Sequence, residues 1–119
     1  MGCDEVVTGI GRTGVVALIK SKTYSVGKVV GLSADMDALP IKEATGADYT
    51  SRTEAVMHAC GHDGHSAILL GAAKYLMEIR NFDGAVVVIF QPAEEGGGGA
   101  RKMCEDNMMT RWNIQEVYG

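Results

Sequence analysis

The chain has 119 residues, of which 46% are hydrophobic and 22% charged, so its length and composition fit one globular domain and exclude a disordered chain. The net charge of −4 argues against a surface for nucleic acid or anionic membrane, which would need a basic patch. No apolar stretch approaches the roughly 20 residues of a membrane span, and the N-terminus lacks the basic and apolar regions of a signal peptide. We therefore expect a cytoplasmic protein whose partners include neither nucleic acid nor a membrane.

Two strands are predicted in the first third of the chain. Residues 15–19 form a short apolar, β-branched run, and residues 28–32 form another. The polar segment 21–27 between them ends in glycine and predicts a hairpin loop. Residues 35–49 show no sustained period and are predicted to be a loop.

The clearest helix is predicted over residues 66–79, where apolar side chains recur at spacings of three and four and Asp63 is a plausible cap. A turn at 81–84 leads to an unbroken apolar run at 85–90, which is typical of a strand covered by helices on both faces. A second helix is predicted from residue 99 or 100 to about residue 108, and Val117 and Tyr118 begin another strand. This order predicts a three-layer α/β fold with residues 85–90 at its centre and residues 66–79 on one face.

Residues 9–14 match the GxGxxG pattern of dinucleotide-binding folds and of kinase glycine loops. The dinucleotide fold needs a helix directly after the glycines, whereas residues 15–19 favour a strand, and the sequence contains no HRD or DFG segment. We interpret these glycines as a turn between two strands. The glycines at 96–99 likewise lack the Lys-Ser/Thr pair of a phosphate-binding loop.

All three histidines lie in one segment, MHACGHDGH, which also holds Cys60 and Asp63. In an extended backbone Cys60 and His62 would face the same side, and thiolates and imidazoles are good ligands for zinc and similar divalent ions. Asp63 could hold a ligating imidazole in one tautomer. The alternative interpretation is a polar loop that caps the following helix.

Two pairs of carboxylates follow predicted strands. Glu94 and Glu95 come directly after the most hydrophobic strand, at the end where ligand sites form in α/β sheets. One glutamate could bind a metal while the other moves protons, or the pair could be a solvated acidic turn. Asp35 and Asp37 follow another strand and lie two residues apart, so the three acidic and histidine-containing segments together suggest one shared site.

Three segments, SADMDALPI, MHACGHDGHSAILLGAAKYL and VVVIFQPAEEGGGGARKM, closely resemble the metal-dependent amidohydrolase and peptidase family of hippurate hydrolases, aminoacylases and indole-acetyl-amino-acid hydrolases. The resemblance runs from about residue 3 to residue 119. It implies a zinc-peptidase-like catalytic domain with a central, mostly parallel sheet. It also implies hydrolysis of the amide bond of N-acyl amino acids at a site for two divalent ions, which would be zinc, manganese, cobalt or nickel.

The resemblance assigns a role to individual residues. It implies Cys60, His62 and Glu95 as metal ligands and Glu94 as the general base. Asp37 matches an aspartate that supports the site, and we expect Asp35 and Asp63 to support it as well.

The chain also departs from this family. Ser33 stands where the bacterial branch usually has arginine, and Ala55 stands where glycine is usual. Family members are longer, start with a further helix, contribute two later histidine ligands, and carry an inserted domain for dimerisation and substrate cover. We therefore expect residues 1–119 to be part of a catalytic domain that is inactive alone, and intact members to form homo-oligomers through the missing domain.

Two other functions remain open from the sequence. One is a non-catalytic metal-binding or interaction module that uses Cys60 and His62. The other is a cysteine hydrolase with Cys60 as nucleophile and His62 or His65 as base. The Cys-Gly-His spacing disfavours the second, because it sets the two side chains alongside each other rather than placing an imidazole against the sulfur.

Overall fold

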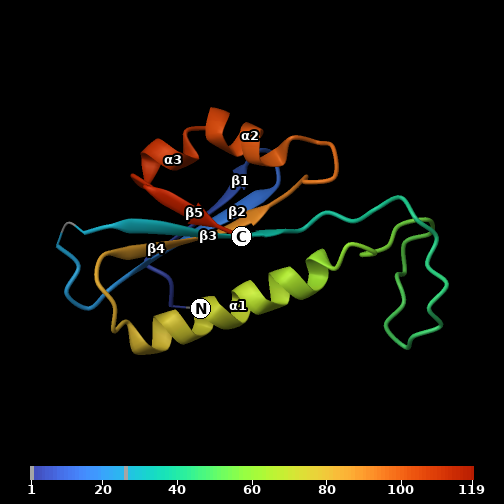
Figure 1. Ribbon diagram of the computed structural model, residues 1–119, viewed down its shortest axis with the longest axis horizontal. Helices are drawn as coiled ribbons and strands as arrows, with labels where there is room; N and C mark the ends of the chain where they lie inside the picture. Colours follow the sequence, from blue (N-terminus) through green and yellow to red (C-terminus); the bar gives the residue numbers. More distant parts are fainter. Residues whose placement is uncertain (1, 26) are drawn as a thin grey trace.

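The computed structural model describes residues 2–25 and 27–119, and Figure 1 shows how their elements are arranged. Within these residues five strands form one sheet in the order β1-β2-β4-β3-β5. The strands are β1 (Glu5–Ile10), β2 (Gly14–Lys20), β3 (Val29–Asp35), β4 (Ala85–Gln91) and β5 (Glu116–Tyr118). The helices are α1 (His62–Ile79), α2 (Gly99–Glu105) and α3 (Met108–Arg111).

The strand β4 occupies the middle of the sheet, because its side chains are apolar toward both faces. Val87, Val88 and Ile89 are at most 2% exposed, so the predicted buried central strand is confirmed. β4 pairs antiparallel with β2 and parallel with β3. Since β1–β2 is antiparallel and β3–β5 parallel, the sheet is mixed, with parallel pairing confined to the half that carries β3 and β5.

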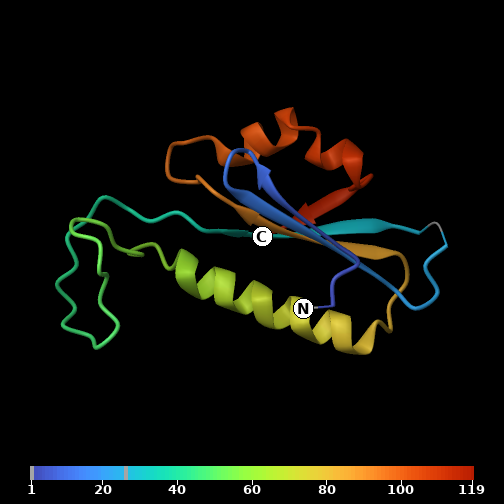
Figure 2. The same ribbon diagram turned by 180° about the vertical axis from the view of Figure 1, so that it is seen from behind.

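Helices cover both faces of the sheet: α1 lies on one side and α2 and α3 lie on the other (Figure 1, Figure 2). The alternation of side chains along β4 divides the core accordingly. Val87 and Ile89 belong to one cluster with Met103 of α2, whereas Val88 belongs to a second cluster with Leu69 of α1. The predicted three-layer α/β fold is therefore confirmed.

The prediction of a hairpin over residues 21–27 is wrong. β2 and β3 do not pair, because β4 lies between them and pairs with both. Val26, within this segment, lies outside the described residues. A strand that is apolar on both faces is most stable in the interior of a sheet, and α1 supplies the long crossover that a parallel β3–β4 pair requires.

The glycines at 9–14 form the turn of the β1–β2 hairpin, as predicted. Gly11 has a φ of +61°, in the left-handed region that favours glycine. A Cβ added at Gly14 would lie 2.5 Å from the carbonyl oxygen of Ile10, so the chain turns too tightly there for a side chain.

The helices differ from their predicted bounds. α1 begins at His62, four residues earlier than predicted, directly after Gly61 at a φ of +91°. Among the described residues no side chain caps this helix, so the prediction of Asp63 as its cap is wrong. The predicted helix over 99–108 is divided, since α2 ends at Glu105 and Asn107 has a φ of +63°. In the part of the chain that the structure describes, no helix combines the length and the apolar character needed to cross a membrane.

Residues 36–61 form a long loop that extends past the carboxyl end of β3 and returns to α1 (Figure 1). Leu39 and Met57 exchange two backbone hydrogen bonds of 2.9 and 3.0 Å and close the base of this loop. Ala55 has a φ of +56°, a conformation that costs an L-residue with a Cβ about 1–2 kcal/mol. This gives a physical reason why the resembled family usually has glycine where this chain has Ala55.

Candidate metal centre

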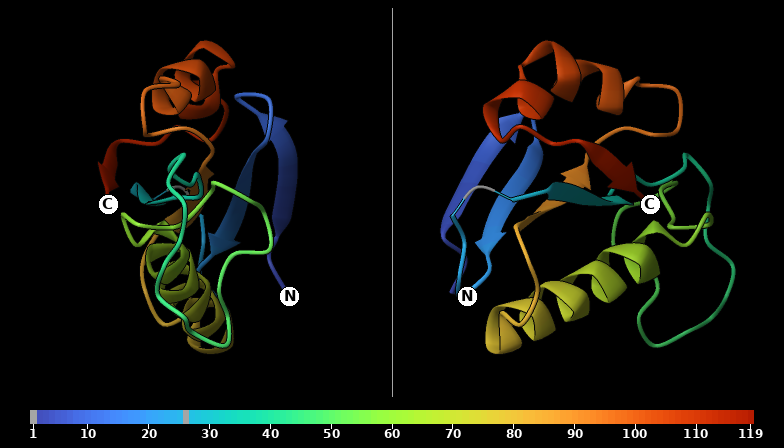
Figure 3. Two further views of the ribbon diagram at one scale, coloured as in Figure 1. Left: turned by 90° about the vertical axis from the view of Figure 1, so that its right-hand side faces the viewer. Right: turned by 60° about the vertical axis from the view of Figure 1, so that its left-hand side comes forward.

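The predicted site residues meet where β3 and β4 end. The two strands are parallel and in register, with Asp35 opposite Gln91 at the last pair. Asp37 lies two residues beyond the end of β3, and the segment with Glu94 and Glu95 follows β4. The first turn of α1 starts beside both, so three separate segments converge at the carboxyl edge of the sheet (Figure 3).

Cys60, His62 and Glu95 form a cluster of three potential ligands. One ligand atom from each, a sulfur, an imidazole nitrogen and a carboxylate oxygen, lies within 4.8 Å of the other two. His62 is only 3% exposed, whereas Cys60 and Glu95 are exposed. The convergence does not come from an extended backbone, because Cys60 lies in a turn and His62 is already helical, with Gly61 reversing the chain between them.

The imidazole of His62 is held through its Nδ1 atom. Nδ1 lies 3.0 Å from the carbonyl oxygen of Asp37 and 3.2 Å from its Oδ1. A proton on Nδ1 therefore has acceptors, and Nε2 is left with its lone pair available. Nε2 faces two further carboxylates, since Oδ2 of Asp35 and Oε2 of Glu94 are each 4.0 Å away.

Asp37 joins two of the converging segments. Its Oδ2 accepts a 2.9 Å hydrogen bond from the backbone N–H of Glu95, while its carbonyl oxygen and Oδ1 contact His62. Oδ1 is buried and has no hydrogen-bond partner that meets the usual geometry among the described residues. Asp37 thus ties the glutamate segment to the first turn of α1.

The electrostatics of the cluster favour a cation. Burial lowers the pKa of His62, but the Asp37 carbonyl oxygen and the nearby carboxylates outweigh it, so the net effect is a raised pKa. A hydrogen bond with Glu95, burial and the surrounding negative charges raise the pKa of Cys60. Burial raises the pKa of Asp37, but backbone N–H groups of the glutamate segment overcome this and lower it.

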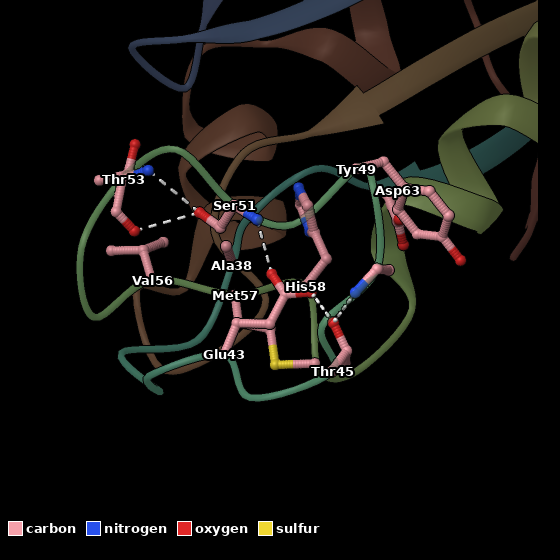
Figure 4. A pocket seen from close by; sticks show the side chains of 11 residues that line it. Ala38, Glu43, Thr45, Tyr49, Ser51, Thr53, Val56, Met57, His58 and Asp63 are labelled. Atoms are coloured by element: carbon pink, nitrogen blue, oxygen red, sulfur yellow. Dashed lines mark hydrogen bonds between the residues drawn. The ribbon is translucent and has the colours of Figure 1, made fainter.

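The other two histidines are not members of this three-residue cluster, although the ring of His65 lies 5.8 Å, centroid to centroid, from the ring of His62. His58 lines a pocket of about 350 Å³ in the 36–61 loop, together with Glu43 and Asp63 (Figure 4). His65 lines a different groove, between α1 and the end of β5. The structure therefore places Asp63 in the loop pocket, and the aspartate beside the His62 ring is Asp37.

Two polar residues at this edge were not predicted from the sequence. Gln91 donates from Nε2 to Oδ1 of Asp35 over 3.0 Å, and Ser66 donates from Oγ to the Asp35 carbonyl oxygen, also over 3.0 Å. Gln91 carried a usable signal, because a single polar residue ends an otherwise apolar strand. Ser66 carried none, since serine is common in the first turns of helices.

A family model described as "Peptidase family M20/M25/M40" matches residues 31–119 of the chain. The chain belongs to this family. The match includes the ends of β3 and β4, all of α1, and every residue of the cluster.

Named M20 relatives share much of the sequence. The chain is 52% identical over 115 residues to a hippurate hydrolase of Campylobacter jejuni, covering 97% of the chain and 29% of that protein. It is 50% identical over 109 residues to an N-acetyl-L-cysteine deacetylase of Bacillus subtilis, covering 91% of the chain and 25% of that protein.

The fold is shared with solved M20 structures. A Bacillus subtilis protein described as a dinuclear metal binding peptidase from the M20 family superposes with a TM-score of 0.88 at 40% identity, covering 97% of this chain and 32% of that one. The chain thus spans less than a third of the length of each of these three relatives.

Proposed function

We propose that the protein carrying this chain is a metal-dependent amidohydrolase that hydrolyses the amide bond of N-acyl amino acids. The observation that carries the proposal is the convergence of Cys60, His62 and Glu95 within 4.8 Å at the carboxyl edge of the sheet. Support comes from membership of the M20 family and from two relatives whose names specify N-acyl amino acid substrates.

The donor set fits a divalent metal ion. A thiolate, an imidazole and a carboxylate are ligands that zinc and its first-row neighbours accept. His62 would bind through Nε2, since Asp37 engages Nδ1. One structural relative is described as dinuclear, so we expect two ions in the intact site, with the further ligands supplied from outside residues 1–119.

Glu94 is proposed as the general base. A divalent ion in such a site makes water more acidic and polarises a carbonyl oxygen. Glu94 is half exposed, and its Oε2 lies 4.0 Å from Nε2 of His62, so its carboxylate is close to the cluster without being one of the three ligands. Its Oε2 would take a proton from the attacking water and return it to the nitrogen of the leaving amine, which conserves protons over the cycle.

Cys60 is not favoured as a nucleophile. Nucleophilic cysteines need a lowered pKa, which comes from cationic neighbours or a helix N-terminus. The carboxylates around Cys60 act in the opposite direction and raise its pKa. Its position beside His62 and Glu95 suits a metal ligand instead.

The two adjacent glutamates provide the test. In the complete gene product, Glu94→Gln should lower kcat for hippurate or N-acetyl-L-cysteine by about 10²–10⁴-fold while leaving metal content unchanged. Glu95→Gln should lose metal as well. Glu78→Gln, an equal change of charge on the exposed side of α1, serves as the control and should alter neither quantity.

Three results would change the assignment. If Glu94→Gln retains most of its kcat or loses metal, the roles of the two glutamates are wrong. If the unmodified protein binds metal through Cys60 and His62 but hydrolyses no N-acyl amino acid, the protein is the non-catalytic metal-binding or interaction module. Activity that survives chelation and is lost on alkylation of Cys60 would indicate the cysteine hydrolase.

A further inference from the structure

Gln91 is an unusual residue for its place in the sheet. It ends the central strand β4 and is only 6% exposed. A buried side-chain amide is costly unless its donors and acceptor are paired. The hydrogen-bond partners of the Gln91 amide therefore indicate why a glutamine occupies this position.

Both ends of the Gln91 amide are engaged. The backbone N–H of Ala93 donates to Oε1 over 2.5 Å, and Nε2 donates to Oδ1 of Asp35 over 3.0 Å. A backbone N–H can only donate and a carboxylate can only accept, so these two partners allow one orientation of the amide. The side chain thus links the end of β3 to the turn that follows β4.

The turn after β4 is packed tightly around this amide. The carbonyl oxygen of Ala93 accepts a 2.8 Å hydrogen bond from the N–H of Gly99, which closes the loop that carries Glu94 and Glu95. A Cβ at Gly99 would lie 2.1 Å from Oε1 of Gln91 and 2.7 Å from the Ala93 nitrogen. The amide of Gln91 therefore occupies the space that a side chain at position 99 would need.

The same amide orients Asp35 relative to the cluster. With Oδ1 of Asp35 held by Gln91, Oδ2 is directed at Nε2 of His62, 4.0 Å away. The Asp35 backbone is fixed independently by Ser66, whose hydroxyl donates to the carbonyl oxygen. The direction of the carboxylate therefore depends on Gln91.

We propose that Gln91 is a positioning residue of the metal centre, which holds the Glu94–Glu95 turn and the Asp35 carboxylate in place through one buried amide. This inference rests on the proposed function, since it concerns the same site. It adds a residue that belongs to neither the ligands nor the proposed base. Partners that orient metal ligands typically contribute about 10–100-fold to metal affinity or activity.

The first experiment removes the amide. Gln91→Met keeps a similar length but neither donates nor accepts as an amide does, and Zn²⁺ affinity is measured by competition with a chelator in the complete gene product. We expect affinity about 10–100-fold weaker than in the unmodified protein. Gln115→Met is the control, because the exposed Gln115 amide also accepts from a backbone N–H, that of Val29, but at the opposite end of β3. Its Zn²⁺ affinity should be unchanged.

A second experiment separates positioning from folding. Gln91→Glu places a carboxylate against Asp35, and the same change in an Asp35→Asn background restores a donor–acceptor pair, since the introduced asparagine amide can donate to the introduced carboxylate. The direct attraction of the added negative charge for the ion is the same in both backgrounds and cancels in the comparison, whereas its contact with residue 35 differs between them. We expect Gln91→Glu to be more damaging to Zn²⁺ affinity with aspartate at position 35 than with asparagine. Equal effects in both backgrounds would overturn the proposal.

Failure of this inference differs from failure of the proposed function. If Cys60→Ser and Glu95→Gln retain full Zn²⁺ affinity, the metal centre itself is wrong. If those two variants lose the metal while Gln91→Met binds it as tightly as the unmodified protein, the metal centre stands and the role of Gln91 is wrong.

Discussion

Two glycine-to-alanine changes should alter stability in opposite directions. Gly99 is the first residue of α2, where alanine would ordinarily be the better helix former. The added Cβ, however, would occupy the space of the Gln91 amide, at 2.1 Å from Oε1. Gly99→Ala must therefore displace that amide and break its two hydrogen bonds.

The size of the effect follows from those bonds. A neutral hydrogen bond contributes about 0.5–1.5 kcal/mol net, and one to a charged group about 1.5–3 kcal/mol. Replacing glycine by alanine in a helix stabilises the folded state by at most about 1 kcal/mol. We expect Gly99→Ala to lower the free energy of unfolding by about 1–4.5 kcal/mol.

Gly71 provides the control. It lies within α1, and an added Cβ there would meet nothing within 4 Å. Gly71→Ala should therefore raise the free energy of unfolding by about 0.5–1 kcal/mol, because glycine loses more backbone entropy on folding than alanine.

Both variants can be measured by urea unfolding, followed by the fluorescence of the chain's single tryptophan, Trp112, which is 7% exposed. If the slope of the unfolding free energy against urea concentration is the same in each variant, a change of midpoint reports a change of stability alone. A Gly99→Ala midpoint at or above that of the unmodified protein would refute the reasoning, because it would mean that the amide can move without loss.

Two further predictions concern stability. The Trp112 indole N–H and a neighbouring arginine lower the pKa of Glu5 below 4.5. The stability that the Glu5 carboxylate contributes to the fold is therefore complete above that pH and is lost as the pH falls through the lowered pKa. Glu5→Gln should reduce the acid sensitivity of unfolding by under about 1 kcal/mol, whereas Glu78→Gln should not change it, and equal acid profiles would contradict this. Ala55→Gly should be more stable than Ala47→Gly by about 1–2 kcal/mol in urea unfolding, because only Ala55 has a positive φ. Equal midpoints for the two loop variants would show that no strain is stored at Ala55.

Local pattern predicted the elements whose signals lie within a few residues. The apolar run at 85–90 and the three- and four-residue spacing at 66–79 have periods that only one kind of element satisfies, and both are confirmed. The glycines at 9–14 were recognised as a turn because the residues after them favour a strand. The helix ends were predicted less accurately. Gly61 precedes α1 and Asn107 separates α2 from α3, each with a positive φ that the sequence around it does not reveal.

The sequence by itself determined which chemical groups are available: a thiol and three imidazoles in one segment, and two pairs of carboxylates placed next to strand ends. Only the tertiary structure decided which of them meet. The insertion of β4 between β2 and β3 is a long-range pairing that no local period encodes, and it brings the Glu94–Glu95 turn beside Asp37. The same pairing sets Gln91 opposite Asp35, so a polar residue at the end of an apolar strand becomes the link between two segments of the site.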